Sequence, residues 1–294
     1  MRCPLVFACD VGYAAHLATT LRSIVESNRA HWPLECHVLA DGFCEQTRRR
    51  VAESIPAGSA TISWARVDVE LFRVYATMDH ISPVTYARLL IPTVFGSDVS
   101  RVLYLDADIL VLKDLKPLFE AHLDGAVVGA VLDGMDSRLK ANKPGLERVP
   151  RVYAYFNAGV LLIDLDRWRK EAISEKAMGY LSAHPDSPFS DQDALNVVCD
   201  GRWMRLDEQW NFQDHDAIAL SAADPDSQPS IIHFVTRDKP WKASSLSVNA
   251  SFYDSFRRRT LFARSWREVA RYWMAVGWHR SSGALRARAS RLSK

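Results

Sequence analysis

Two aspartates one residue apart are the first residues of this chain that could carry chemistry. Asp106 and Asp108 follow the apolar run Val102–Leu105. In an extended backbone, side chains at i and i+2 point the same way, so both carboxylates can face one divalent cation. Carboxylate oxygens suit Mg²⁺ or Mn²⁺, which neutralise phosphate oxygens. The pair predicts a cation that holds a diphosphate, although two aspartates in a turn or helix cap share this spacing.

Two other chemistries use an Asp-x-Asp pair. A calcium loop of the EF-hand kind needs Gly at its sixth position, where this chain has Val111, so that loop is excluded. An aspartyl-phosphate phosphatase, with Asp106 as the phosphorylated group, usually has Gly or small hydroxyl residues after its second Asp. Residues 109–112 instead continue the apolar run. The phosphatase is the weaker alternative.

The elements that must position these groups alternate between strands and helices. The pattern predicts strands at Leu5–Ala8, Glu35–Leu39, Thr61–Trp64, the run before Asp106, Ala126–Leu132 and Gly159–Ile163, and helices at Tyr13–Ser27, Glu45–Ser54 and Thr85–Ile91, the last ended by Pro92. Such alternation predicts an α/β fold with a mainly parallel sheet, whose ligands bind beyond the carboxyl ends of the strands. Asp10 and Asp106 both fall there. The polar stretch 134–152 predicts a loop.

Composition and charge bound the remaining possibilities. The 294 residues are 48% hydrophobic and 24% charged, enough for one large domain or two small ones. From Arg257 onwards there are eleven Lys and Arg and one acid, Glu268, although the whole chain carries only +2. The body is therefore acidic and the end basic. Asp10 interrupts the first apolar stretch, so we expect no secretory signal, and no run reaches the roughly 18–20 apolar residues of a spanning helix. Five cysteines without a Cys-x-x-Cys pair predict free thiols in a reducing cytoplasm.

Several motifs in order give the chain a resemblance to a known family. They are Phe7-Ala8-Cys9-Asp10 with Tyr13-Ala14, His80-Ile81-Ser82 with Thr85-Tyr86-Ala87-Arg88-Leu89, Tyr104-Leu105-Asp106-Ala107-Asp108, Tyr155-Phe156-Asn157-Ala158-Gly159, Asp191-Gln192-Asp193, and His233 with Lys239-Pro240-Trp241. Over about residues 4–242 the chain resembles family 8 retaining glycosyltransferases of the bacterial lipopolysaccharide galactosyl/glucosyltransferase type. The resemblance implies a GT-A fold, which is a Rossmann-like sheet flanked by helices.

The resemblance also implies a reaction and a site. The chain would transfer galactose or glucose from a UDP-sugar to a hydroxyl of a lipopolysaccharide or other surface glycan. Asp106, Asp108 and His233 would bind Mn²⁺, with Mg²⁺ as the alternative, and Lys239 would stabilise the departing UDP. The implied donor-binding residues are Ala8, Asp10, Tyr13, Arg88, Asp106, Ala107, Asn157, Ala158, Asp191, Gln192 and Lys239; the acceptor-binding ones are His80, Thr85 and Asp133; Asp191, Gln192 and Lys239 are catalytic. Retention would ordinarily use a carboxylate nucleophile. Because the family has an amide there, here Gln192, a front-face route is the open alternative.

The chain departs from the family pattern at two places. Val11-Gly12 stands where a second polar pair is usual, which puts one nucleotide contact in doubt. Thr236 stands three residues after His233, where a Gly is common in the family, so the loop that closes over the donor would be stiffer or would select a different acceptor.

The basic end carries an aromatic stripe. Phe262, Trp266, Val269, Trp273 and Val276 recur at helical spacing, with Arg264, Arg267 and Arg271 beside them. This pattern predicts a helical tail, residues 251–294, that follows a catalytic domain over 1–250 and lies on an anionic membrane surface. A helix packed on the core is the alternative, and no nucleic-acid-binding motif accompanies the charge. The expected location is the cytoplasmic face of the inner membrane. The competing function class is a non-catalytic sugar-nucleotide or membrane-binding protein of the same fold.

Overall fold

A seven-stranded sheet forms the centre of the protein in a computed structural model that describes residues 3–72, 75, 82–214, 219–221, 224–242, 245, 247–270 and 274. The strand order is β3-β2-β1-β4-β7-β6-β8. Its strands are β1 (Leu5–Asp10), β2 (Leu34–Asp41), β3 (Ala60–Arg66), β4 (Arg101–Leu105), β6 (Val128–Leu132), β7 (Phe156–Asp164) and β8 (Trp203–Arg205). Strands β3, β2, β1 and β4 run parallel, whereas β7 is antiparallel to both β4 and β6. The predicted α/β fold with a mainly parallel sheet is confirmed.

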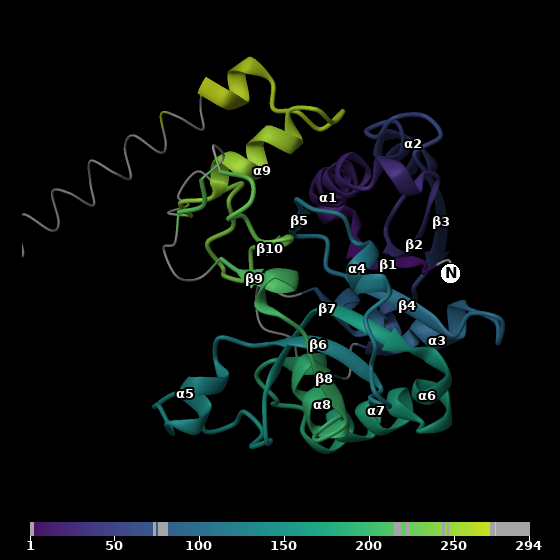
Figure 1. The fold of residues 1–294 in the computed structure, drawn as a ribbon, viewed down its shortest axis with the longest axis vertical. Coiled ribbons are helices and arrows are strands. Elements are labelled where there is room, and N and C mark those ends of the chain that lie inside the picture. Colours follow the sequence, from purple (N-terminus) through teal and green to yellow (C-terminus); the bar gives the residue numbers. More distant parts are fainter. Residues whose placement is uncertain are drawn as a thin grey trace, which may run out of the picture.

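Helices cover both faces of this sheet (Figure 1). The α-helices of the described residues are α1 (Ala14–Ser27), α2 (Glu45–Ala52), α3 (Ile91–Val94), α4 (Lys116–Phe119), α5 (Asp136–Lys140), α6 (Leu165–Lys170), α7 (Ile173–Ala183), α8 (Ser190–Val198) and α9 (Ala250–Arg257), of which α5 and α9 lie apart from the sheet. Side chains of β1 alternate between the two layers: Leu5 and Phe7 pack with α1, and Val6 packs with the layer that contains α6 and α7. Because β1 is buried on both faces, its sequence is a nearly continuous apolar run.

Three local predictions were wrong. Asp106 and Asp108 do not lie in an extended strand, because the chain turns at residues 106–108 before β5 (Ile109–Val111) begins. The helix expected at Thr85–Ile91 is a 3₁₀ helix over Pro83–Leu90. Pro92 does not end it but lies in the first turn of α3, where its missing N–H costs no hydrogen bond. The 134–152 stretch is irregular, as expected, except for α5.

A small second sheet carries the chain back to the turn at 106–108. It consists of β5, β10 (Ile231–His233) and β9 (Phe212–Gln213), in the order β5-β10-β9. In the antiparallel register of β10 with β5, His233 lies opposite Ile109. The N–H of Phe234 also donates to the Asp108 carbonyl at 3.2 Å. Two segments far apart in sequence are thereby held side by side.

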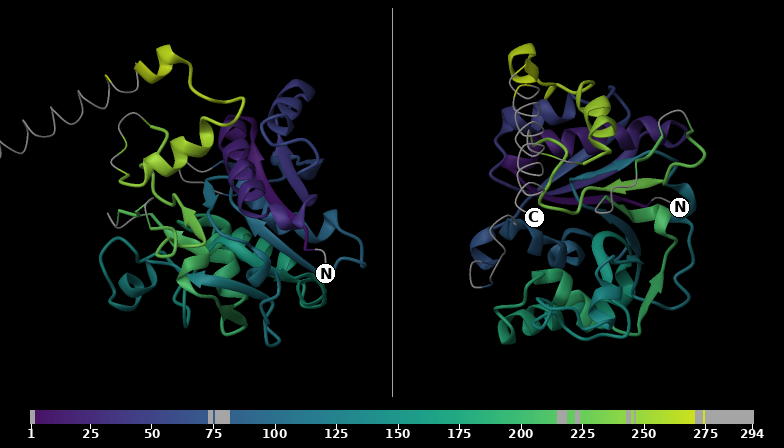
Figure 2. Two further views of the ribbon diagram at one scale, coloured as in Figure 1. Left: turned by 45° about the horizontal axis from the view of Figure 1, so that its top comes forward. Right: turned by 90° about the vertical axis from the view of Figure 1, so that its left-hand side faces the viewer.

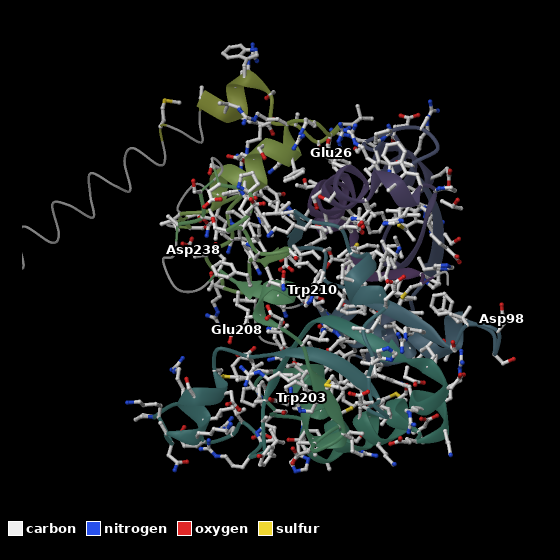
Figure 3. The ribbon with its side chains drawn as sticks, in the orientation of Figure 1. Glu26, Asp98, Trp203, Glu208, Trp210 and Asp238 are labelled. Carbon is white, nitrogen blue, oxygen red and sulfur yellow. The ribbon has the colours of Figure 1, made fainter. Side chains whose placement is uncertain are left out.

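Helix α9, near the yellow end of the colour scale, packs on the purple helix α1 (Figure 2). Tyr253 of α9 is buried and its hydroxyl is hydrogen-bonded to Nδ1 of His16. Arg259 forms an ion pair with Glu26 at 2.6 Å, near the Glu26 label in Figure 3. Residues 266–270 form a further helical turn, and Trp273 and Val276 lie outside the described residues. In the part of the chain that the structure describes, no helix is both long and apolar enough to cross a membrane.

Candidate active site

A cavity of about 460 Å³ opens beside the ends of β1 and β4. Most of the residues that the sequence singled out line it: Ala8, Asp10, Tyr13, Thr85, Arg88, Asp106, Ala107, Asp108, Asp133, Asn157, Asp191, Gln192, His233 and Lys239. Ala158 is not a lining residue, and His80 lies outside the described residues. After the ligands that the family resemblance implies, we call the part around Asp106, Asp108, His233 and Lys239 the metal-facing end, and the part around Arg88, Asp133, Asn157, Asp191 and Gln192 the sugar-facing end.

At the metal-facing end, three ligand-type atoms converge. Atoms of Asp106, Asp108 and His233 all lie within 4.8 Å of one another. Nε2 of His233 is 3.3 Å from Oδ1 of Asp108 and 3.7 Å from Oδ2 of Asp106. The turn at 106–108 and the β5–β10 register bring them together, rather than the alternation of an extended strand.

The two oxygens of Asp106 have different partners. Oδ1 accepts hydrogen bonds from the Tyr104 hydroxyl at 2.6 Å and from Nη2 of Arg88 at 3.3 Å. Oδ2 is the atom that faces His233. The first oxygen therefore fixes the carboxylate, and the second is presented to the cavity.

Asp108 is held beside a buried lysine. Nζ of Lys239 lies 2.7 Å from Oδ2 of Asp108, and Lys239 is only 9% exposed. Burial favours a higher pKa for Asp108, but Lys239 and His233 outweigh it and hold the pKa well below the usual range. Oδ1 is buried, and no described residue donates a hydrogen bond to it. A buried carboxylate oxygen without a donor is costly unless a cation compensates it.

Gly159 leaves the space that this arrangement needs. A Cβ at this position would lie 2.1 Å from Cε1 of His233 and 2.7 Å from Oδ2 of Asp106. The N–H of Asp106 donates to the Gly159 carbonyl at 2.8 Å, which ties the end of β4 to β7. Any side chain at residue 159 would push the imidazole and the carboxylate apart.

These residues fit a divalent cation. Ligands of Mg²⁺ lie about 2.0–2.1 Å from the ion, so adjacent ligand atoms of an octahedral site are about 3 Å apart. The separations from His233 to the two carboxylates are close to that value. Two carboxylate oxygens with one imidazole suit Mn²⁺ well and Mg²⁺ less well. The unsatisfied Oδ1 of Asp108 is the atom whose chemistry most needs such an ion.

At the sugar-facing end, a buried ion pair organises the polar groups. Nε of Arg88 lies 2.7 Å from Oδ2 of Asp191, and Nη1 of Arg88 donates to the Ala158 carbonyl at 2.5 Å. Thr85 bridges the pair, since its hydroxyl donates to Oδ1 of Asp191 and accepts from Nη2 of Arg88, both at 2.9 Å. Burial raises the pKa of Asp191 to about 6, although Arg88 acts to lower it.

Gln192 has a fixed orientation. Its Oε1 accepts a hydrogen bond from the Ala158 N–H at 2.9 Å. Because a backbone N–H can only donate, the amide nitrogen must face the other way, towards Oδ2 of Asp133 at 3.4 Å. Ala158 thus contributes its backbone, which holds both Arg88 and Gln192, rather than its side chain.

The third part of the cavity contains Ala8, Asp10 and Tyr13. Asp10 precedes the 3₁₀ helix Val11–Tyr13 but makes no capping hydrogen bond with its side chain. The side chain of Asp10 therefore does not cap the helix that follows it. Trp241, two residues beyond Lys239, meets Tyr13 edge to face with ring centroids 5.9 Å apart and stacks on His16 at 3.7 Å.

Sequence reasoning missed several residues of the site. Tyr104, Met135, Arg138, Phe189 and Gln213 line the cavity, and Asn211 supports it from behind through His233. Tyr104 and Gly159 lie inside motifs that the sequence analysis quoted, so their identity was visible but their function was not. Asn211 carries no local signal, because its side-chain partners are 22 and 54 residues away.

The fold and the site together define a glycosyltransferase. A family model described as glycosyl transferase family 8 matches residues 4–245, so the chain belongs to this family. The crystal structure of the galactosyltransferase LgtC in complex with donor and acceptor sugar analogues is 28% identical, with a TM-score of 0.76 over 87% of this chain and 96% of that chain. This likeness confirms the GT-A fold and the family predicted from the motifs.

Curated relatives agree with this assignment. Glycosyltransferase GlyF of Streptococcus pneumoniae is 32% identical over 260 residues, which are 84% of this chain and 59% of GlyF. The lipopolysaccharide 1,2-glucosyltransferase of Escherichia coli is 26% identical over 263 residues, which are 85% of this chain and 75% of that enzyme. Membership of a glycosyltransferase family removes the phosphatase alternative.

Proposed function

We propose that this protein is a Mn²⁺-dependent retaining hexosyltransferase. It transfers galactose or glucose from a UDP-sugar to a hydroxyl of a lipopolysaccharide or other surface glycan. The observation that carries this proposal is the convergence of Asp106, Asp108 and His233 with Lys239 in one cavity, next to the polar groups of the sugar-facing end. A donor with a diphosphate on one side and a hexose on the other matches that division.

The metal-facing end would hold the diphosphate. A bound Mn²⁺ would act as a Lewis acid that neutralises charge on the diphosphate oxygens. Lys239 is already buried beside Asp108, so its ammonium group is placed within reach of the same oxygens. There it would stabilise the negative charge that develops on UDP as the sugar leaves.

The sugar-facing end would read the hydroxyls of the hexose. Asp191, whose carboxylate is paired with Arg88, can accept hydrogen bonds from hydroxyl groups, and Asn157 and Gln192 present amide groups. The Gln192 oxygen already accepts the Ala158 N–H, which favours a positioning role over a nucleophilic one. That favours the front-face route, in which the departing diphosphate accepts the proton of the acceptor hydroxyl.

The remaining assignments are proposals on family resemblance. Ala8, Asp10 and Tyr13 would bind the uridine, where a small residue lets the base approach the backbone. Asp133 lies at the cavity wall, where an acceptor hydroxyl could reach it, and Thr85 and His80 complete the proposed acceptor set. The hydroxyl of Thr85 already bridges Arg88 and Asp191, so Thr85 would act mainly by fixing Asp191.

Release of UDP tests the proposal without knowledge of the acceptor. We would incubate the protein with UDP-galactose or UDP-glucose, each with Mn²⁺ and with EDTA, because donor hydrolysis requires only water. Manganese-dependent release from one donor would support the class and identify the sugar. Binding of UDP without release from either, even after an acceptor screen, would favour the non-catalytic alternative.

We also propose that the end of the chain lies on an anionic membrane surface at the cytoplasmic side. Trp266 is 75% exposed and lies next to Arg267, whose guanidinium is 5.2 Å from the Trp266 ring centre. Arg264 has a different role, since it pairs with Asp254 at 2.8 Å and donates to the Trp241 carbonyl. The membrane-facing part would therefore begin after residue 264.

Vesicle binding tests this second proposal. A chain that ends at residue 264 keeps the contacts of α9, so it should remain folded and lose binding to phosphatidylglycerol vesicles. Trp266→Ser should weaken binding in the full chain, whereas Tyr153→Ser, a change at another highly exposed aromatic residue, should not. Equal binding of the full and shortened chains would refute membrane association through this segment.

A further inference from the structure

Behind the metal-facing end, four polar side chains form a continuous chain of hydrogen bonds. Nδ2 of Asn157 lies 3.0 Å from Oδ2 of Asp133, Nδ2 of Asn211 lies 2.9 Å from Oδ1 of Asn157, and Oδ1 of Asn211 lies 2.9 Å from Nδ1 of His233. Asn157, Asn211 and His233 are all buried. This series of hydrogen bonds therefore connects the sugar-facing end to a proposed metal ligand through the interior of the protein.

One group with a single hydrogen-bonding role fixes the direction of these hydrogen bonds. The Gly159 backbone N–H, 3.0 Å from Oδ1 of Asn157, can only donate, so the atom that faces it must be the amide oxygen. Asn157 must therefore point its nitrogen at Asp133 and its oxygen at Gly159. That same oxygen then requires the nitrogen of Asn211, which leaves the oxygen of Asn211 facing His233.

These directions decide which ring nitrogen of His233 carries a proton. Oδ1 of Asn211 can only accept, so Nδ1 of His233 must carry a proton. Nε2 is the nitrogen that faces Asp106 and Asp108. A metal ligand has to present a lone pair, and the hydrogen bond of the other ring nitrogen decides which nitrogen can do so.

We propose that Asn211 is a positioning residue that keeps Nδ1 of His233 protonated and so presents Nε2 to the cation. Asn211 lies at the end of the 3₁₀ helix Glu208–Asn211, whose Glu208 and Trp210 are labelled in Figure 3. It reaches the cation only through His233, and it is oriented in turn by Asn157 and Asp133. This inference rests on the proposed metal site, and it also links the sugar-facing end to the metal-facing end through buried hydrogen bonds.

Two substitutions at residue 211 separate positioning from packing. Asn211→Leu removes both hydrogen bonds and should weaken Mn²⁺ binding about 10- to 100-fold, the usual effect of losing a partner of a metal-binding histidine. Asn211→Asp still accepts from Nδ1 but loses the hydrogen bond to Oδ1 of Asn157, so it should lower stability and yet keep clearly more Mn²⁺ affinity than Asn211→Leu. Asn28→Leu is the matched control, because Asn28 is also a buried asparagine with two hydrogen bonds, at the far end of α1. It should lower thermal stability and leave Mn²⁺ affinity unchanged.

The readouts are Mn²⁺ titration by electron paramagnetic resonance and long-range ¹H–¹⁵N spectra of histidine-labelled protein, with and without Mg²⁺. His233→Asn identifies the His233 signals. We expect a protonated Nδ1 in the natural protein and in Asn211→Asp. An unprotonated Nδ1 in the natural protein would overturn the proposal, as would an unchanged Mn²⁺ affinity in folded Asn211→Leu. If Asn211→Leu does not fold, the spectra of the natural protein and of Asn211→Asp still decide. Neither readout depends on sugar transfer, so failure of the proposed reaction would be seen separately.

Discussion

The two ends of the cavity differ in how a buried carboxylate oxygen without a hydrogen-bond donor is compensated. At the sugar-facing end, Oδ2 of Asp191 is such an atom in the described part of the chain, but Nε of the Arg88 guanidinium lies 2.7 Å from it; Thr85 bridges the pair, and Gln192 is held by the backbone. At the metal-facing end, one oxygen of Asp108 has no donor among the described residues, and Nε2 of His233 faces two carboxylates. The buried carboxylate of the sugar-facing end is paired with a protein cation on the oxygen that lacks a donor, whereas at the metal-facing end the corresponding oxygen of Asp108 faces the two other candidate metal ligands.

This difference predicts different responses to substitution. A change at the metal-facing end should act mainly on cation binding and therefore on turnover. A change at the sugar-facing end should also disturb a buried network, because removing one partner of a buried hydrogen bond leaves the other partner unpaired, which costs free energy.

The largest effect is expected from Asp108→Asn. The amide keeps the shape of the carboxylate but removes a charge from the proposed cation site. We expect turnover to fall more than about 100-fold, because loss of a ligand should exceed the effect of losing a ligand's partner. A cation at 100 times its Kd adds about 2.7 kcal/mol of stability, which is roughly 5–10 °C in Tm for a protein of this size. Mn²⁺ should therefore raise the Tm of the natural protein and not that of Asp108→Asn.

The control for that substitution is Asp98→Asn. Asp98 lies on the surface between α3 and β4, as Figure 3 shows, and should keep both turnover and the Mn²⁺-dependent rise in Tm. A similar rise in Tm for Asp108→Asn would mean that the cation binds elsewhere.

Gly159→Ala should give the next largest effect. Its Cβ would overlap His233 and Asp106, so the two groups must separate. We expect Mn²⁺ affinity to fall about 10- to 100-fold and the free energy of unfolding to fall by about 1–3 kcal/mol. Gly179→Ala provides the matched change in α7, where no atom lies within 4 Å of the new Cβ. It should raise stability by about 0.5–1 kcal/mol and keep affinity. Calorimetric titration measures the Mn²⁺ affinity, and chemical unfolding measures the free energy of unfolding. An unchanged Mn²⁺ affinity in Gly159→Ala would refute the proposed geometry.

A pH profile tests the sugar-facing end. Burial, only partly opposed by Arg88, raises the pKa of Asp191 from its ordinary 3.8 to about 6. If ionised Asp191 reads the sugar, UDP release at saturating Mn²⁺ should fall about tenfold near pH 5 relative to pH 7–8. The stability effect has the opposite sign: the folded state holds the proton longer than the unfolded state, so this group's contribution declines as pH rises from about 4 to 6. Asp191→Asn should remove that decline, and a flat activity profile down to pH 5 would argue against the role of Asp191.

Tyr104→Phe should have the smallest effect. It removes one of the two hydrogen bonds to Oδ1 of Asp106 and keeps the one from Arg88. A single hydrogen bond contributes about 0.5–1.5 kcal/mol, so Mn²⁺ affinity should fall about 2- to 10-fold. Titration with Mn²⁺ measures this affinity. If Tyr104→Phe lost as much Mn²⁺ affinity as Gly159→Ala, the hydrogen bond from Arg88 would not be holding Asp106 as described.

The sequence predicted groups whose signal is local and missed those that depend on distant pairing. Asp106 and Asp108 were recognised from their spacing, yet the extended geometry assumed for them was wrong, because their convergence with His233 comes from the turn and from the register of β10 on β5. The buried strand β1 could be read from its apolar run. The antiparallel direction of β7 could not, since a buried strand has the same composition in either direction. Asn211 illustrates the limit, because only the folded chain places it beside Asn157 and His233.

Anomalous scattering from a crystal grown with Mn²⁺ tests the central claim most directly. The account predicts one peak at the metal-facing end, roughly 2.0–2.3 Å from Oδ2 of Asp106, Oδ1 of Asp108 and Nε2 of His233. A peak elsewhere, or none at this position with the three side chains arranged as described, would contradict it.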